Sequence, residues 1–127
     1  MVFVLRDFKI LSIITLCGFI IFLIYYATLD NRFIYVEELH DFPVPLKAEL
    51  VRETDSLKDY YWDPSRGDGI PFHYQLMIKK SGWQRVKNVD GLVYEKNGHY
   101  ISYSPATDYF DISDYTKYWE ADNGREN

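Results

Sequence analysis

The sequence is poor in cysteine, with Cys17 alone among 127 residues. A single cysteine excludes an intramolecular disulfide and any metal site made of several thiolates. The three histidines, His40, His73 and His99, show no spacing typical of metal ligands. No serine lies in the setting of a nucleophile elbow. We therefore expect no metal ion and no organic cofactor, and the sequence points to no catalytic residue.

Positive charge is scarce as well, with 14 lysines and arginines against 19 aspartates and glutamates. Two basic residues and one acidic residue precede position 30, which leaves 12 basic and 18 acidic side chains, a balance of −6, in residues 30–127. A domain with this charge is repelled by phosphate backbones. We therefore predict that nucleic acid is not a partner.

Residues 10–29, ILSIITLCGFIIFLIYYATL, contain neither a charge nor a proline. At a rise of about 1.5 Å per residue, such a helix spans about 30 Å, the thickness of the hydrocarbon layer of a membrane. It lacks the polar face of a helix in a soluble protein. A cleaved signal peptide would need small residues before the cut, and the best candidate site, Ala27, has the bulky Tyr25 two positions before it. We therefore predict an uncleaved, single-pass transmembrane anchor.

The residues on either side of this segment predict its orientation. Arg6, Lys9 and the N-terminal amine precede it, whereas Arg32 follows it among several acidic residues. Basic flanks favour the cytoplasmic side of a membrane. We therefore expect a protein of the cell membrane with residues 1–9 in the cytoplasm and everything after the anchor outside it.

Two prolines, Pro43 and Pro45, follow the predicted anchor at a short distance. Each proline fixes its own φ angle and favours an extended conformation in the residue before it. This pattern predicts an extracytoplasmic stalk at residues 30–45, although the segment could also lead into a strand. Residues 46–115 then form a small domain, and residues 116–127 form an acidic tail that frays at its charged end.

The pattern of the domain predicts an α+β fold. Alternating or aromatic runs indicate strands at 47–53, 58–63, 83–89 and 91–104, and an edge strand at 108–113. The clearest signal is the Asn97-Gly98 pair, which favours a type I′ hairpin turn and makes Leu92 face Tyr103 and Tyr94 face Ile101. We expect a small antiparallel sheet packed against one helix, in the order β-β-α-β-β-β.

The helix is predicted at residues 70–81. Lys79 and Lys80 would lie in its last turn, beside the negative end of the helix dipole, and Gly82 would be a left-handed stop. A strand is the alternative, because residues 71–80 also alternate between apolar and polar side chains. The helix would collect apolar side chains on one face: Ile70, Tyr74, Met77, Ile78 and Ser81.

The stretch DPSRGDGIPF, residues 63–72, allows three interpretations. It contains the Arg66-Gly67-Asp68 tripeptide known from adhesion ligands, but nothing beyond these three letters supports that role. A calcium loop beginning at Asp63 would lack the required residues at its fifth, sixth and twelfth positions. We predict a turn followed by a helix start, with Asp68 and Gly69 at the cap and Pro71 in the first turn.

Several motifs together resemble small single-pass membrane-anchored proteins of Bacillus-type Gram-positive bacteria. The motifs are the proline pair in FPVPLKAEL, an aromatic-tryptophan pair, the helix exit in GIPFHYQLMIKKSGW and the hairpin in GLVYEKNGHYISYSPATDYFDI. The resemblance covers most of the chain after the anchor. It implies an extracytoplasmic location and a fold, and it assigns no catalytic residue.

Aromatic residues are abundant, with 12 tyrosines and 8 phenylalanines. Packing within the sheet and core explains many of them. An exposed aromatic, acidic surface that binds a protein, a peptide or a glycan is the sharper interpretation. The residues that could form such a surface are Tyr60, Tyr61, Trp62, Tyr100, Tyr109, Tyr115, Tyr118 and Trp119.

These observations favour a non-enzymatic domain that is tethered to the membrane and binds a partner, such as an envelope protein, a peptide or a toxin. A small carboxylate-dependent hydrolase is one alternative, because any two of the many carboxylates could meet in space. The other alternative is a structural accessory subunit of a membrane complex. In that case the anchor itself would pack against another membrane protein through Thr15 and Gly18.

Overall fold

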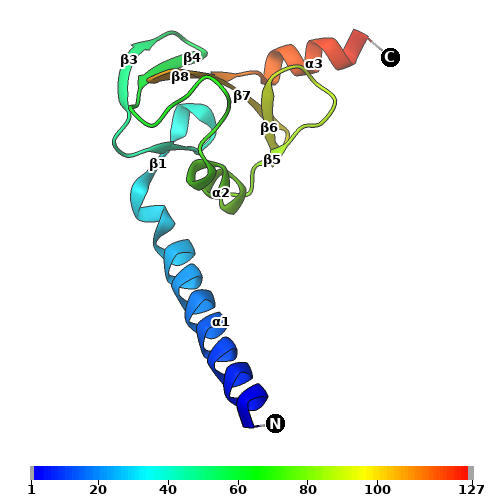
Figure 1. The fold of residues 1–127 in the computed structure, drawn as a ribbon. Helices are drawn as coiled ribbons and strands as arrows, with labels where there is room; N and C mark the ends of the chain where they lie inside the picture. Colours follow the sequence, from blue (N-terminus) through cyan, green and yellow to red (C-terminus); the bar gives the residue numbers. More distant parts are fainter. Residues whose placement is uncertain (1, 126–127) are drawn as a thin grey trace. The chain divides into compact units, whose positions relative to one another are not determined.

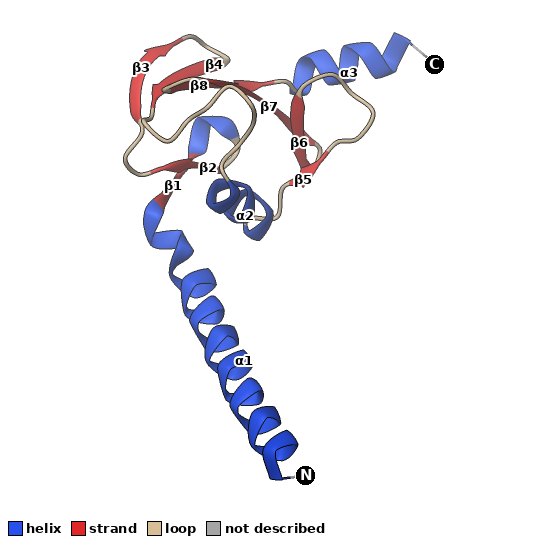
Figure 2. Cartoon of the chain, in the orientation of Figure 1, coloured by secondary structure: helices blue, strands red, loops and turns tan. Residues whose placement is uncertain are grey.

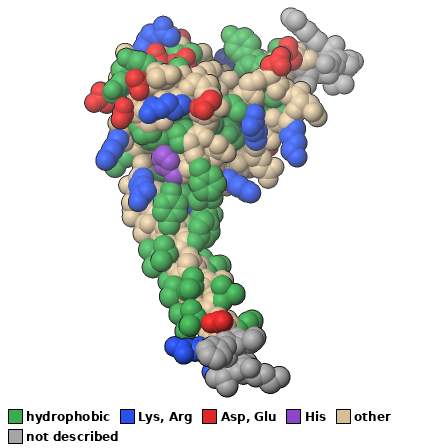
Figure 3. Space-filling view, viewed as in Figure 1, with side chains coloured by type: hydrophobic (Ala, Val, Ile, Leu, Met, Phe, Trp, Pro, Cys, Tyr) green, Lys and Arg blue, Asp and Glu red, His purple; other side chains and the backbone are tan. Residues whose placement is uncertain are grey.

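The protein is described by a computed structural model covering residues 2–125. The chain divides into two compact units, Met1–Asn31 and Arg32–Asn127. The first unit contains the helix α1 (Val2–Thr28) and the first three residues of the 3-10 turn η1 (Leu29–Arg32), whose last residue belongs to the second unit (Figure 1). On the face shown in Figure 3, the visible side chains of α1 beyond its charged N-terminal part are mostly hydrophobic, whereas charged side chains of both signs occur on the second unit. The prediction of a long apolar helix is confirmed, and this helix is long and apolar enough to cross a membrane.

The second unit is built on a six-stranded antiparallel sheet (Figure 2). This confirms the α+β class, although the order of elements along the chain contains more strands than the predicted β-β-α-β-β-β, and a further helix after them. In spatial order, the strands are β3 (Glu49–Glu53), β4 (Leu57–Tyr61), β8 (Tyr109–Asp114), β7 (His99–Ala106), β6 (Leu92–Lys96) and β5 (Gln84–Arg85). The predicted strand at 83–89 is therefore reduced to two residues.

The predicted stalk is instead part of the folded unit. Strands β1 (Phe33–Val36) and β2 (Phe42–Pro45) pair as an antiparallel hairpin around the 3-10 turn η2 (Glu37–Leu39). Phe42 and Val44 have no exposed surface. Proline is tolerated here because the hairpin forms its own two-stranded sheet, in which each strand has a free edge where a missing N–H breaks no ladder bond. The proline pair thus marks a buried strand rather than a spacer.

The predicted helix is confirmed as α2 (Phe72–Lys80). Tyr74, Met77 and Ile78 are buried, as the helical face required. The stop signal is also confirmed, because Gly82 has a φ of 93° and the Trp83 N–H donates to the Ile78 carbonyl. The predicted cap is wrong. Pro71 is the residue before the first turn, and no side chain caps it.

The loop before α2 is the predicted turn, and a buried serine fixes it. The Ser65 hydroxyl lies 2.8 Å from the Ala106 carbonyl oxygen and 2.7 Å from the Tyr109 carbonyl oxygen. Arg66 lies 3.7 Å from the Asp108 carboxylate. The serine and the arginine of this stretch thus make contacts within the fold, which explains why they occur there.

The core lies between the sheet on one side and α2 with the β1–β2 hairpin on the other. Tyr74 is at its centre and makes edge contacts with the rings of Trp62 and Tyr103. Its hydroxyl donates to the Pro43 carbonyl at 2.7 Å, which joins α2 to β2. Aromatic contacts of this kind give a small domain much buried area per residue.

The hairpin predicted at Asn97-Gly98 is confirmed, including its register. Leu92 pairs with Tyr103 and Tyr94 pairs with Ile101. Both turn residues have positive φ, 53° at Asn97 and 82° at Gly98, as a type I′ turn requires.

One expectation near the C-terminus is wrong. Strand β8 is not an edge strand, because it pairs with β4 on one side and β7 on the other. The predicted acidic tail begins with the helix α3 (Thr116–Arg125). Trp119 of α3 stacks on Tyr100 with 4.5 Å between ring centroids, which holds the helix against β7. The last two residues of the predicted tail, and residue 1 of the predicted cytoplasmic segment, lie outside the described residues.

Candidate functional site

Two of the aromatic residues predicted to bind a partner are in the core instead. Tyr60 and Trp62 are only 6% and 5% exposed. Tyr60 stacks on Phe110, and Trp62 contacts the ring of Tyr74. The strand alternation explains the error, because an aromatic run such as Tyr60-Tyr61-Trp62 must send alternate rings to opposite faces. These two residues form no part of an exposed surface.

The residue between them points the other way. Tyr61 and Tyr109 are cross-strand partners on β4 and β8, and their rings meet edge to face at 5.3 Å. Both side chains are exposed, Tyr61 at 38% and Tyr109 at 46%. The pair therefore forms a small aromatic platform on the face of the sheet that α2 and the β1–β2 hairpin do not cover.

The remaining predicted aromatic residues gather near α3. Tyr100 is half-buried under Trp119, and Tyr115 stacks on Tyr118 with centroids 5.8 Å apart. Tyr118 is 66% exposed. The structure thus divides the predicted set into a buried pair, the Tyr61–Tyr109 platform and an α3 cluster.

Two aspartates lie between these aromatic groups on the same face of the sheet. Asp59 on β4 and Asp111 on β8 are direct cross-strand partners, one pair along from Tyr61 and Tyr109. Burial, a hydrogen bond with Asp59 and the charge of Asp59 raise the pKa of Asp111 to about 6, against an opposing effect of Arg52. Asp111 therefore takes up a proton in mildly acidic solution, where an ordinary aspartate would be ionised.

The local sequences explain why these side chains meet. In LKDYY and YFDISD, period-2 alternation places the aspartates and the exposed tyrosines on one face. Tyr60, Phe110 and Ile112 then fall on the buried face. Sequence reasoning missed the aspartate pair because the pairing of β4 with β8 was not predicted. We call Asp59, Tyr61, Tyr109 and Asp111 the acidic face.

One cation lies near the acidic face. The Arg52 Nε atom on β3 is 4.0 Å from Asp59 Oδ2, and the arginine side chain is 66% exposed. Ion pairs at such exposed positions contribute little to stability. Another cation could therefore displace Arg52 from Asp59. The positive charge of Arg52 offsets the charge of Asp111 less than that of Asp59, because its ion pair is with Asp59.

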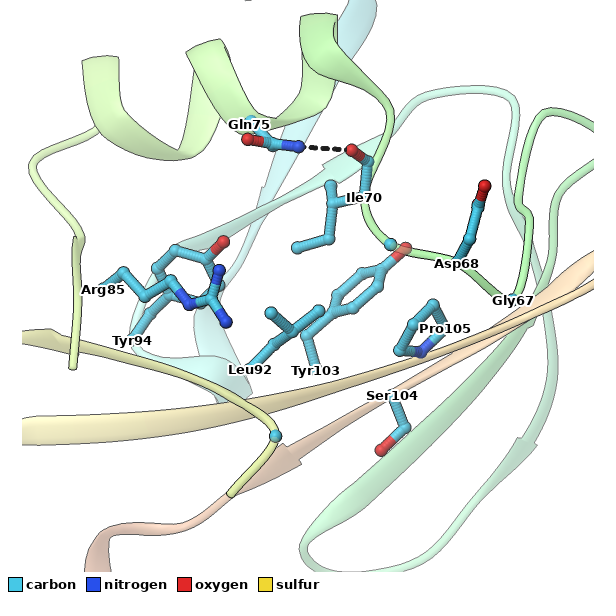
Figure 4. Close-up of a pocket in the computed structure, with 12 residues that line it drawn as sticks. Gly67, Asp68, Ile70, Gln75, Arg85, Leu92, Tyr94, Tyr103, Ser104 and Pro105 are labelled. Atoms are coloured by element: carbon cyan, nitrogen blue, oxygen red, sulfur yellow. Dashed lines mark hydrogen bonds between the residues drawn. The ribbon is translucent and has the colours of Figure 1, made fainter. Parts of the chain in front are cut away.

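A separate hollow of about 510 Å³ lies on the other side of the sheet, next to the turn before α2. Figure 4 shows Ile70, Leu92 and Tyr103 lining its middle, with Arg85 and Asp68 on opposite sides. The Arg85 charge lowers the pKa of Tyr94, although burial of Tyr94 has the larger, opposite effect and raises it overall.

Sequence reasoning also missed a histidine cluster. The rings of His40 and His99 stack with 3.7 Å between centroids, and His40 Nε2 lies 3.0 Å from Asp114 Oδ2. His40 has a left-handed backbone conformation, with φ 57°, and Asp114, which its ring contacts, is the last residue of β8. His73 lies elsewhere, against Phe33 and Trp62. Within residues 2–125, no group of three or more histidine, cysteine or acidic residues is arranged to hold a metal ion.

No protein-family model, curated protein or solved structure matches this chain. Membership of the single-pass family that the sequence motifs suggested stays a prediction. The functional argument therefore depends on the chain's own residues.

Proposed function

We propose that this protein is a non-enzymatic binding protein, tethered to the cell membrane by α1, whose acidic face captures a positively charged segment of another protein. The partner would be an envelope or membrane protein, a peptide or a toxin that presents lysine or arginine. The Asp59–Asp111 pair is the observation that carries this proposal.

Two like charges directly opposite each other on adjacent strands destabilise a sheet. Apolar or oppositely charged residues would serve the fold better at these positions. A guanidinium or ammonium group from a partner would relieve the repulsion, because it could contact both carboxylates at once. The charge repulsion that destabilises the free domain is removed when a cation binds, and this gain adds to the affinity for the cation.

The tyrosines beside the pair suit the same ligand. Tyrosine offers a large contact area with few rotatable bonds, and its ring face attracts cations. Tyr61 and Tyr109 are exposed next to the aspartates. A partner segment in which a basic residue adjoins an apolar one could therefore bind with its cation on the aspartates and its apolar side chain on the tyrosines of the acidic face.

The binding test uses the full chain in discs of zwitterionic lipid and a fluorescent peptide of alternating arginine and glycine. A citrulline peptide, which is isosteric and neutral, is the ligand control. Asp59→Asn with Asp111→Asn should weaken binding by about tenfold, the equivalent of about 1.4 kcal/mol. Asp63→Asn with Asp90→Asn removes the same charge from two exposed sites elsewhere and should leave the affinity within twofold.

Binding should also weaken as the pH falls through about 6, because Asp111 then takes up a proton. Equal losses in the two double variants would mean that only net charge matters, and would refute the acidic face as the site. Equal binding of the citrulline peptide would refute the requirement for a cation.

The topology is tested in intact cells. A tag at the C-terminus should be removed by protease added outside, while a tag at the N-terminus should be protected. Protection of the C-terminal tag, or a mature chain that begins after Ala27, would contradict the tethered arrangement.

A carboxylate-dependent hydrolase is the second candidate, and the same aspartate pair favours it. One protonated and one ionised carboxyl group are suited to acid and base roles. However, neither aspartate lines the hollows described in residues 2–125. Since catalysis usually needs a site that excludes water, an open sheet face suits binding better.

A further inference from the structure

We propose that the hollow beside α2 is a second binding site, which takes a small organic carboxylate with an apolar body. The site is independent of the acidic face. It lies between the turn before α2 and strands β5, β6 and β7, and its volume of about 510 Å³ is within the range of small-molecule sites.

The anion-binding end is formed by Arg85. Its side chain is exposed and lines the hollow, and Figure 4 shows the guanidinium directed inward. Within the described part of the chain, the Arg85 side chain makes no hydrogen bond or ion pair, and its charge acts on the neighbouring Tyr94. The guanidinium and the Tyr94 side chain therefore lie at the same end of the hollow, and no carboxylate side chain of the described residues lines that end. A carboxylate is the group whose geometry matches a guanidinium fork.

The apolar part of the ligand would lie on the middle of the hollow. Ile70, Leu92 and Pro105 supply apolar surface there, and the Tyr103 ring lies among them. The Tyr103 hydroxyl is buried and makes no well-formed hydrogen bond, although the Ser65 hydroxyl is close enough to lower its pKa slightly against the larger effect of burial. The contact with a ligand would therefore be made by the Tyr103 ring, because the hydroxyl itself has no accessible surface.

The charges around the hollow set the ligand class. Asp68 is on the side of the hollow opposite Arg85, so it does not neutralise the guanidinium. The rest of the domain is acidic, which disfavours ligands with several negative charges. A singly charged carboxylate is therefore favoured over a phosphate or a polyanion.

The test is a titration of the full chain in zwitterionic lipid discs with benzoate, and with benzamide as the neutral match. The methyl NMR signals of Ile70 and Leu92 report on the hollow, and the buried Ile112 reports on the rest of the core. Benzoate should shift Ile70 and Leu92 saturably, with a Kd on the order of 1 mM for so small a ligand.

Three variants separate the proposal from its alternatives. Arg85→Gln should weaken benzoate binding at least tenfold, Tyr94→Phe should weaken it by less, and Lys87→Gln, next to the site but outside the hollow, should not change it. An unchanged Ile112 signal in each variant shows that the fold is retained. The proposal is overturned if benzamide binds as well as benzoate, if Arg85→Gln has no effect, or if saturating benzoate leaves Ile70 and Leu92 unshifted.

Discussion

His40 Nε2 lies 3.0 Å from Asp114 Oδ2, and this contact joins the corner of the β1–β2 hairpin to the start of α3. The same aspartate accepts the Thr116 N–H at 3.1 Å through its other oxygen. One carboxylate therefore fixes both a loop and a helix terminus.

The first prediction tests this junction. His40→Asn should lower the free energy of unfolding by about 1 kcal/mol, because asparagine keeps the left-handed backbone but does not reach Asp114. Asp114→Asn should have a similar effect, and the double variant should lose less than the sum of the two. Denaturant unfolding of the full chain in detergent measures all three, and strict additivity would show that the contact contributes nothing.

The pH dependence of this junction has a definite sign. Burial works to raise the pKa of Asp114, but hydrogen bonds with Thr116 and His40 lower it overall. The ionised carboxylate therefore stabilises the fold above its ordinary pKa near 3.8, and that contribution is lost as the pH falls through the lower folded value. Asp114→Asn should remove this acid sensitivity.

The second prediction concerns the aspartate pair. Asp111→Asn should raise the free energy of unfolding at pH 7 by about 0.5–1 kcal/mol, because it removes a like-charge pair. Since the pKa of Asp111 is raised to about 6, the wild type loses stability as the pH rises from about 4 to 6. The advantage of the variant should be full above pH 6 and absent below pH 4.

Asp63→Asn is the matched control, because it also removes one negative charge but lies at an exposed position outside the sheet. It should change the free energy of unfolding little at either pH. If Asp111→Asn were destabilising at pH 7, the aspartate pair would not be the strained feature on which the proposed function depends.

The third prediction compares two buried tyrosines. Tyr74→Phe should cost about 1–2 kcal/mol, because it leaves the Pro43 carbonyl without its donor inside the core. Tyr103→Phe should cost less, since the Tyr103 hydroxyl makes no well-formed hydrogen bond. Thermal unfolding of the two variants measures the difference, and equal costs would contradict the role of Tyr74 in holding the hairpin.

The sequence correctly predicted those turns, helices and strands whose conformation depends on a few neighbouring residues. The Asn97-Gly98 turn and the Gly82 helix stop depend on backbone conformations that few residues adopt, and both were readable. The alternation of β6 and β7 then fixed their register. The N-terminal helix was equally plain, because twenty consecutive uncharged residues have few other structures available.

Long-range pairing was not readable. Asp59 and Asp111 are brought together by β4 and β8, which are separated by about fifty residues. Neither segment carries a sequence signal that indicates the other as its partner strand. The hairpin at 33–45 was missed for a related reason. Its prolines favour an extended backbone both in a solvated spacer and in a short strand. Only packing against the rest of the domain, which the sequence does not show, decides between the two structures.

The short link between α1 and β1 limits where a protease could separate the apolar helix from the folded unit. Only η1 stands between the two elements, and its first residue, Leu29, is buried. A cut beyond Phe33 would divide β1, the partner strand of β2, and would expose the apolar side chains of Phe42 and Val44, so the released fragment should aggregate.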